Sequence, residues 1–268
     1  VLDEVVQEMS TWVADSSLLR FNRAPPGEWF GVSADVVRVV AAAAVVSITT
    51  EGAFDVTVAP LVDEIGFGPA TVPADEAVQV DYRLLEFREH PPALRKRAPL
   101  QVDLSAIAKG FAVDRVAELL ADVGCTSALV EIGGELRVFG AAPGGGAWRV
   151  AIESPGEGFA PGTLTLDEGG IATSGDYRQI GERDGMRTTH IIDARTGTPI
   201  DGFLASATVI APTAMQADAM ATALMALGRD AFAFAEMHHV AAVLVFRSER
   251  GFATRVSPAL DALGALAR

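Results

Sequence analysis

The spacing of hydrophobic residues along the chain predicts several helices. An Ala- and Val-rich stretch after Ser33 repeats apolar residues at helical spacing as far as about Thr50, and Ser33 is placed to cap its first turn. A second stretch covers residues 106–123, with Ser105 as its cap and Gly124 just after its end. Further helices are predicted over residues 1–19, residues 214–227, which stop at Gly228, and residues 229–237.

Short apolar runs bounded by glycine predict strands between these helices. They fall at residues 126–132, 135–140, 147–153, 163–168, 170–173, 189–193, 204–211, 240–246 and 251–256. Gly133 and Gly134 separate the first two runs and are typical of a hairpin turn. The Pro-rich stretch 69–100 is predicted to hold a short helix with loops. Helices interleaved with hairpin-connected strands favour an α+β fold with mixed or antiparallel sheets, in a single domain over residues 1–268.

The composition restricts the classes of partner. Half of the 268 residues are hydrophobic and 21% are charged, and no apolar run reaches the ~18 residues that a membrane-spanning helix needs. The formal charge of −14 excludes the basic footprint of a nucleic-acid binder and disfavours an anionic membrane surface. An acidic protein that handles phosphate must supply positive charge locally, through a bound divalent metal or a lysine. Val1 to Glu8 carry no basic region, so no signal peptide is predicted, and the single Cys125 excludes an intrachain disulfide.

Asp218 and Thr222 are a candidate pair of metal ligands. They stand four residues apart on the predicted helix 214–227, so their oxygens share one face. A carboxylate and a hydroxyl one turn apart suit a hard cation such as Mg²⁺. The alternative is an ordinary polar stripe on the helix.

Lys109 is a candidate phosphate-binding residue. The chain has only two lysines, and this one stands in the first turns of a predicted helix, shortly after Asp103 and Ser105. Helix N-termini favour anions, and a lysine there can hold a phosphate as a point charge. The alternative is a solvated lysine behind an ordinary N-cap.

His190 is the candidate for acid–base chemistry. It opens a predicted strand, with Asp193 and Arg195 shortly after it, and a histidine beside an acid can act as a general base near neutral pH. A hydrogen-bonded structural histidine is the alternative. Phe54, judged alone, is a core residue rather than one that stacks on a ring.

The order of six sequence blocks along the chain carries more weight than any one of them. They are Gly-Ala-Phe-Asp-x-Thr followed by Pro-Leu-Val and Gly-Phe-Gly (52–68), Asp-Leu-Ser-Ala-Ile-Ala-Lys-Gly-Phe-Ala-Val-Asp (103–114), Gly-Gly-Glu (133–135), Thr-Ser-Gly-Asp-Tyr (173–177), His-Ile-Ile-Asp-x-Arg-Thr-Gly-x-Pro (190–199) and Ala-Asp-Ala-x-Ala-Thr-Ala (217–223). This ordered series resembles the ApbE family of flavin transferases, over about residues 5–246.

The resemblance implies a single ApbE-like α+β unit related to the T-fold, with FAD as substrate and Mg²⁺ as the metal. Carried over residue by residue, the metal ligands are Asp218, Thr222 and the backbone carbonyl of Ala106. The FAD contacts implied in the same way are Ala53, Phe54, Asp55, Asp103, Lys109 and Ile191, with Ser174, Gly175 and Tyr177 close to the same cleft. His190 and Asp218 are the implied catalytic residues.

The implied reaction is Mg²⁺-dependent transfer of FMN from FAD to a Thr or Ser hydroxyl of a partner flavoprotein, with release of AMP. The acceptor expected is an Asp-x-x-Ser/Thr-Gly-Ala-Thr type of site. Two alternatives stay open: a Mg²⁺-dependent FAD diphosphatase that forms FMN and AMP, and a flavin-binding protein without turnover. The resemblance also suggests a cell-envelope location, exported or lipid-anchored, with a cytoplasmic form as the alternative.

Some positions depart from the family pattern. Ala194 replaces a usual Pro, Phe111 stands where Tyr is common, and Glu131 replaces a small polar residue. The family usually opens with a strand that carries Met-Gly-Thr, and this chain has no such segment. We therefore expect part of the flavin pocket to be missing from it.

Overall fold

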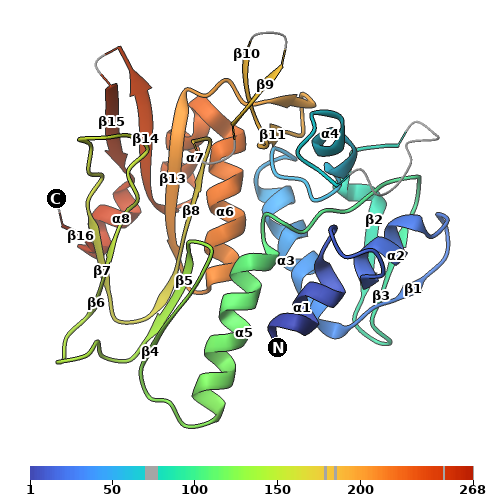
Figure 1. The fold of residues 1–268 in the computed structure, drawn as a ribbon, viewed down its shortest axis with the longest axis horizontal. Helices are drawn as coiled ribbons and strands as arrows, with labels where there is room; N and C mark the ends of the chain where they lie inside the picture. The colour runs from blue at the N-terminus through green and yellow to red at the C-terminus, as the bar shows by residue number, and fades with distance from the viewer. Residues whose placement is uncertain (70–77, 178–179, 184–185, 250, 268) are drawn as a thin grey trace. The chain divides into compact units, whose positions relative to one another are not determined.

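The computed structural model describes residues 1–69, 78–177, 180–183, 186–249 and 251–267. Its contacts divide the chain into two compact units (Figure 1). The first unit comprises Val1–Ala108 with Ile192–Pro199, and the second comprises Lys109–Ile191 with Ile200–Arg268. The single domain expected over residues 1–268 stays a prediction.

The first unit contains short helices and a small antiparallel sheet. The helices are α1 (Leu2–Met9), α2 (Ser17–Arg23), α3 (Ala34–Thr49), α4 (Ala59–Glu64) and a 3-10 turn (Tyr82–Leu84). The strands β1 (Phe30–Gly31), β2 (Leu85–Arg88) and β3 (Ala93–Lys96) pair in the order β1-β3-β2, and β11 (Ile192–Asp193) pairs with β12 (Thr198–Pro199). The cap predicted for α3 is confirmed, because the Ser33 hydroxyl accepts the Val36 N–H.

Two predictions for the first unit are wrong. Residues 1–19 do not form one helix: α1 ends at Met9, and Ser16 starts α2 by accepting the Leu19 N–H. Residues 85–96 form two paired strands instead of a short helix with loops, although residues 70–77 of that stretch lie outside the described residues. Each strand is only four residues long, which is near the lower limit for a strand, and neither alternates regularly between buried and exposed side chains, so the sequence carries no clear strand pattern here.

The second unit is built on a six-stranded antiparallel sheet in the order β15-β14-β13-β8-β5-β4. Its strands are β4 (Ala128–Ile132), β5 (Glu135–Phe139), β8 (Gly169–Gly175), β13 (Leu204–Ala211), β14 (Ala241–Ser248) and β15 (Gly251–Val256). A three-stranded sheet is made of β6 (Trp148–Ala151), β7 (Thr163–Leu166) and β16 (Leu266–Ala267), and β9 (Ile180–Arg183) pairs with β10 (Met186–Thr189). The helices are α5 (Ala108–Asp122), α6 (Ala214–Leu227), a 3-10 turn (Gly228–Asp230), α7 (Ala231–Met237) and α8 (Pro258–Leu263).

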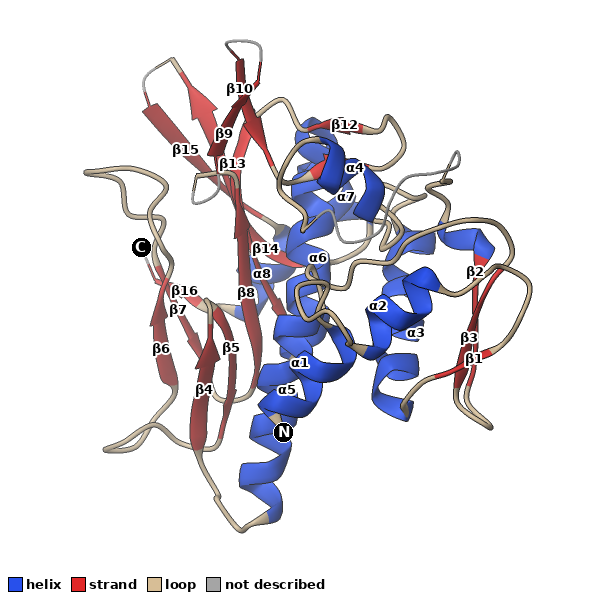
Figure 2. Cartoon of the chain, turned by 45° about the vertical axis from the view of Figure 1, so that its right-hand side comes forward, coloured by secondary structure: helices blue, strands red, loops and turns tan. Residues whose placement is uncertain are grey.

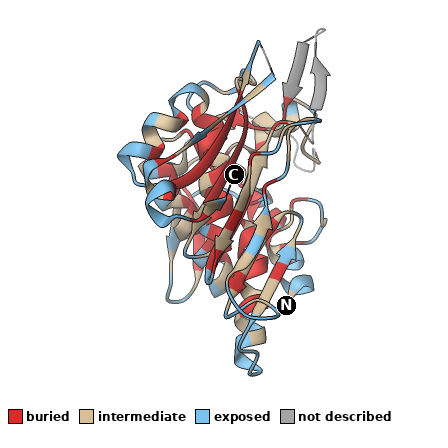
Figure 3. Ribbon diagram, turned by 90° about the vertical axis from the view of Figure 1, so that its left-hand side faces the viewer, coloured by how far each residue is buried: buried red, intermediate tan, exposed pale blue. Residues whose placement is uncertain are grey.

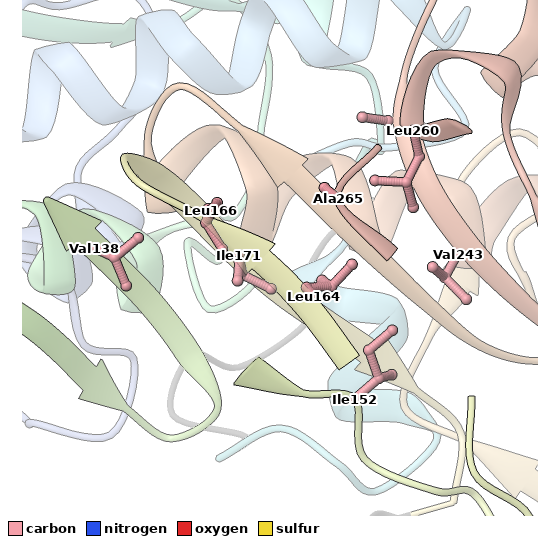
Figure 4. Close-up of a cluster of buried hydrophobic side chains, with 9 residues drawn as sticks. Val138, Ile152, Leu164, Leu166, Ile171, Val243, Leu260 and Ala265 are labelled. Carbon is pink, nitrogen blue, oxygen red and sulfur yellow. The ribbon is translucent and has the colours of Figure 1, made fainter. Parts of the chain in front are cut away.

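The central strands of this sheet are covered on both faces. Helix α6 packs against β8 and β13, beside which Figure 2 draws it. On the other face, the strands of the three-stranded sheet contribute to a second apolar cluster that contains Val138, Leu164 and Val243 (Figure 4). Six successive residues of β13 and of β14 are therefore buried, as the red strands of Figure 3 show. Burial on both faces explains why these strands read in the sequence as continuous apolar runs.

The α+β prediction is confirmed by these helices and antiparallel sheets. Helix α6 begins and ends at the predicted residues, and Gly228 at its end has a φ of +55°. One predicted helix start is wrong: helix α5 begins at Ala108 rather than 106, after a turn in which the Ser105 N–H donates to Asp103. Within the residues described, no helix combines the length and the apolar character needed to cross a membrane.

Candidate functional site

Three charged side chains of the second unit meet from three different elements. Lys109 on α5 places its Nζ 3.1 Å from Glu135 Oε1 at the start of β5 and 3.2 Å from Asp218 Oδ1 on α6. The Glu135 and Asp218 side chains are buried, with 5% and 2% of their surfaces exposed, whereas the Lys109 side chain is 47% exposed. We call these three residues the Lys109 cluster. The cluster thus combines a partly exposed lysine side chain with two buried carboxylates.

Close packing of α5 on α6 brings Asp218 to Lys109. The Gly110 N–H donates to Asp218 Oδ2 at 2.9 Å. A Cβ on Gly110 would lie only 2.3 Å from the carbonyl oxygen of Ala214, so no other residue fits there without moving a helix. The glycine after Lys109 in the second sequence block is thus required by helix packing.

Asp114, one turn further along α5, fixes the start of α6. Its two carboxylate oxygens accept the N–H groups of Ala214 and Met215, each at 2.9 Å, and Thr213 accepts the N–H of Gln216. The first N–H groups of α6 are therefore satisfied in the interior. Burial raises the pKa of Asp114, and the two N–H donors partly offset this effect. Since Asp218 follows on the next turn, this contact positions it as well.

Two buried carboxylates share a single ammonium in the Lys109 cluster. Burial, and then the charge of Asp218, raise the pKa of Glu135 to about 7, although Lys109 lowers it. Burial raises the pKa of Asp218 too, against the lowering effects of Lys109 and the Gly110 N–H. Burial opposes the charge on Lys109, yet the two carboxylates raise its pKa above the ordinary value. When both acids are ionised, the two carboxylates carry one negative charge more than the single ammonium neutralises.

This charge imbalance fits a bound cation. Asp218 supplies a carboxylate, and Thr222, on the next turn of α6, supplies a hydroxyl that lies 2.9 Å from the hydroxyl of Ser174. If Thr222 donates this bond, its lone pairs remain for a cation. The buried Oε2 of Glu135 has no hydrogen-bond partner among the described residues. The same residues contain no group of three His, Cys, Asp or Glu side chains arranged for a metal. Mg²⁺ commonly binds through one or two carboxylates and completes its coordination with waters and substrate phosphate oxygens.

The remaining predicted residues of the second unit lie around the ends of β8 and β10. His190 follows the last residue of β10 and is half-buried, and Ile191 is buried, with its carbonyl oxygen accepting the Ile200 N–H. Gly175 ends β8, and the Tyr177 hydroxyl donates to Glu153 at 3.2 Å. Ser174 and Thr222 are brought together by the hydrogen bond between their hydroxyls.

The predicted FAD-binding residues Ala53, Phe54, Asp55 and Asp103 and the predicted ligand Ala106 belong to the first unit. Ala53 and Phe54 are buried, and the Ala53 carbonyl oxygen accepts the Ala194 N–H at 3.4 Å. Ala106 lies in the turn that precedes α5. These positions are described only within their own unit, and their roles stay predictions.

Two aspartates of the first unit organise its turns. Asp55 accepts the N–H and the hydroxyl of Thr57, both at 2.7 Å, and the Tyr82 N–H at 2.8 Å. Burial raises the pKa of Asp55, and these bonds counteract the rise. Asp103 accepts the N–H and the hydroxyl of Ser105, which closes the turn before α5.

The sequence interpretation missed two residues that shape the site. Glu135 was noted only as the end of the Gly-Gly-Glu block, and Asp114 only as the end of the block 103–114. Their only signal in the sequence is that each is an acid at the end of its block. Their partners lie about 26 and 100 residues away in sequence, so no local pattern reveals them.

Comparisons with known proteins agree with the order of the sequence blocks. Residues 1–244 match the model of the ApbE family. A protein of Haemophilus influenzae named FAD:protein FMN transferase is 41% identical over 98% of this chain and 81% of its own length. A Vibrio cholerae protein with the same name is 42% identical over 94% of this chain and 79% of its own length.

Solved structures are similar over nearly the whole chain. The flavinyl transferase ApbE from Pseudomonas stutzeri, in its apo form, has a TM-score of 0.88 and 39% identity, and the match covers 98% of this chain and 85% of that one. The flavin transferase ApbE from Vibrio cholerae has a TM-score of 0.85 and 38% identity, covering 97% and 87% of the two chains.

Proposed function

Since the chain belongs to the ApbE family, we propose that it is an FAD:protein FMN transferase, which moves FMN from FAD to a Thr or Ser hydroxyl of a partner flavoprotein. The observation that carries this proposal is the Lys109 cluster, with Thr222 one turn beyond Asp218. A lysine with a partly exposed side chain, paired with two buried carboxylates, provides both a contact for a diphosphate and a place for a cation.

In the proposed reaction, the acceptor hydroxyl oxygen attacks the phosphorus on the FMN side of the FAD diphosphate. The bond from this phosphorus to the bridging oxygen breaks, AMP leaves with that oxygen, and the hydroxyl proton is released. A flavinyl phosphoester remains on the acceptor. The barrier lies mainly in positioning the groups and in stabilising charge on the phosphoryl oxygens.

We assign the metal to Asp218, the Thr222 hydroxyl and the backbone carbonyl of Ala106. When bound, Mg²⁺ would neutralise charge on the diphosphate and on the leaving oxygen. The buried position of Asp218 supports this assignment, because a buried carboxylate with one shared ammonium gains from a further positive charge.

The protein's own groups have separate tasks in the proposal. Lys109 holds the diphosphate as a point charge, and His190 accepts the proton of the acceptor hydroxyl. Eight residues are proposed to bind the rest of FAD through their side chains or backbone: Ala53, Phe54, Asp55, Asp103, Ser174, Gly175, Tyr177 and Ile191. The acceptor is a flavoprotein with an Asp-x-x-Ser/Thr-Gly-Ala-Thr type of site.

One incubation tests the activity and separates it from hydrolysis. The protein is mixed with FAD and Mg²⁺, with and without an acceptor domain of that type, and mass spectrometry of the acceptor is combined with measurement of AMP. We expect the acceptor to gain the mass of FMN less water, with AMP formed in proportion. AMP and FMN formed equally fast without acceptor would instead identify an FAD diphosphatase, and unchanged FAD would identify a flavin-binding protein.

A further inference from the structure

Glu135 occupies an unusual position for a structural carboxylate. It is the first residue of β5, directly after the turn at Gly133 and Gly134, whose φ angles are +68° and +106°. Its Oε1 contacts Lys109, and its buried Oε2 has no hydrogen-bond partner among the described residues. A Cβ on Gly133 would lie 3.4 Å from Oε2 and 3.9 Å from Lys109 Cδ, so the turn passes directly over this ion pair.

Stability alone does not explain the burial of Glu135. A buried carboxylate costs free energy unless its oxygens are well satisfied, and here one oxygen is not. The ammonium that it contacts already has a carboxylate partner in Asp218, which the Gly110 N–H also satisfies. Removing Glu135 would therefore leave a complete Lys109–Asp218 pair, so the second acid must have another purpose.

The role of Glu135 follows from competition between a bound cation and the Lys109 ammonium for the Asp218 carboxylate. A divalent cation on Asp218 repels the ammonium that shares this carboxylate. The Lys109 side chain is long and 47% exposed, so without another partner it would turn into water. Glu135 approaches the ammonium from a different element, β5, and at a similar distance.

We propose that Glu135 is a positioning residue that keeps the Lys109 ammonium in place while Asp218 holds a cation, so that lysine and metal can act on one diphosphate together. This inference rests on the proposed function. Two other roles are possible outcomes of its test: a purely structural role, and a role as a direct ligand of the cation through Oε2.

Chemical labelling of Lys109 tests this role independently of turnover. The chain has only two lysines, and Lys96 is buried, so it serves as an internal reference for a small amine-acylating reagent. Labelling of each lysine is followed by peptide mass spectrometry, with and without Mg²⁺, in the wild type and in Glu135→Gln. The matched control is Glu131→Gln, at the other end of the same turn, where the exposed carboxylate accepts the Gly134 N–H.

In the wild type and in Glu131→Gln, we expect Mg²⁺ to change the labelling rate of Lys109 little. In Glu135→Gln, Mg²⁺ should speed it by about two- to fivefold, the factor that corresponds to the loss of an ion pair worth ~0.5–1 kcal/mol. Equal rates in Glu135→Gln and the wild type with Mg²⁺ would overturn the proposal, whether or not the protein transfers FMN.

A double-mutant cycle on flavin binding provides the second measurement. The dissociation constant of FAD is measured by flavin fluorescence in Glu135→Gln, Lys109→Ala and the double variant, with Mg²⁺ titrated in each. We expect Glu135→Gln to weaken FAD binding in the wild-type background and to have no further effect once Lys109 is Ala. Additive effects would show that Glu135 does not act through Lys109. A raised Mg²⁺ requirement with unchanged FAD binding would make Glu135 a ligand of the cation, and either result contradicts the proposal.

Discussion

At the scale of single residues, the site depends on how each buried charge is satisfied. Asp218 has a backbone donor in Gly110 and an ammonium in Lys109, which partly offset the rise that burial causes in its pKa. Lys96, the buried lysine, is in a different position: its Nζ donates to the carbonyl oxygen of Asn22 and lies 5.3 Å from the ring centre of Phe21. One lysine is thus held charged at the proposed site, and the other is penalised for its charge.

The first prediction concerns Asp218. Asp218→Asn keeps an acceptor for the Gly110 N–H but removes the charge that holds the metal, so the protein should fold and lose turnover. The loss should be on the order of 10²-fold or more, because a metal contributes several kcal/mol to such reactions. Steady-state AMP release at limiting Mg²⁺ measures it, with circular dichroism as the control for folding. Near-normal activity of this variant would remove Asp218 from the list of ligands.

The second prediction concerns Lys96. Burial lowers its pKa from 10.5 to about 8, so between pH 8 and 10.5 the folded protein has released a proton that the unfolded chain still binds. The free energy of unfolding should therefore rise with pH through this window, by up to about 3 kcal/mol from this group, and the full cost should be present below pH 8. Urea unfolding at pH 7.5, 9 and 10 measures the rise, which Lys96→Met should lack. Parallel pH profiles for the two proteins would contradict the assigned pKa.

At the scale of elements, the site is a product of how α5 packs on α6. Gly110 lets the two helices approach, and Asp114 caps the start of α6. Val113 and Ala117 of α5 pack with Ala214 of α6 in one apolar cluster. The same face of α5 therefore carries the packing contacts, the cap and Lys109, which explains why the sequence block 103–114 combines apolar, small and charged residues.

The third prediction separates packing from helix propensity at Gly110. Alanine favours a helix over glycine by ~1 kcal/mol, so local propensity alone predicts that Gly110→Ala stabilises the protein. The backbone of Ala214 leaves no room for the added methyl group, so we expect a net loss of about 1–3 kcal/mol in the free energy of unfolding. Gly31→Ala, in the strand β1, is a control for the added methyl group without a clash, because a Cβ there meets no atom within 4 Å. Denaturant unfolding of the three proteins decides between the two effects, and a stabilised Gly110→Ala would show that the helices can separate at little cost.

At the scale of the whole molecule, the two units are interleaved along the chain. The first unit includes Ile192–Pro199, which the sequence inserts into the second, so the chain passes between the units at three points. Helix α5 begins with the last residue of the first unit and continues into the second. Neither unit is one continuous stretch of sequence, and this makes independent folding of either one costly in chain entropy.

The fourth prediction is that the chain unfolds as one cooperative domain. Trp12 and Trp29 belong to the first unit and Trp148 to the second, so variants that keep tryptophan in one unit alone report on that unit. Their fluorescence transitions in urea should share one midpoint and one slope, as expected for two-state unfolding. Two separated midpoints would instead define two domains, and the single-domain prediction would be wrong.

The sequence by itself determined the features that depend on neighbouring residues. Periodicity, capping residues and glycines within a few positions predict four features. These are the bounds of α6, the Ser33 cap, the turn at Gly133 and Gly134, and the strand β13. The ordered blocks also placed the chain in its family, because a series of short motifs remains readable when each motif alone is ambiguous. The placement of Asp218 and Thr222 on one face of α6 also follows from local spacing, because they stand four residues apart.

Only the tertiary structure decided which distant residues meet. Three contacts join residues from different elements: Glu135 pairs with Lys109, Asp114 caps α6, and Ser174 bonds to Thr222. The strands β2 and β3 are equally invisible in the sequence, because these four-residue strands are stabilised by pairing with each other rather than by local preference. Local patterns fix the backbone of a segment over a few residues, whereas burial and ion pairing depend on which segments pack together, and that is settled by the fold as a whole.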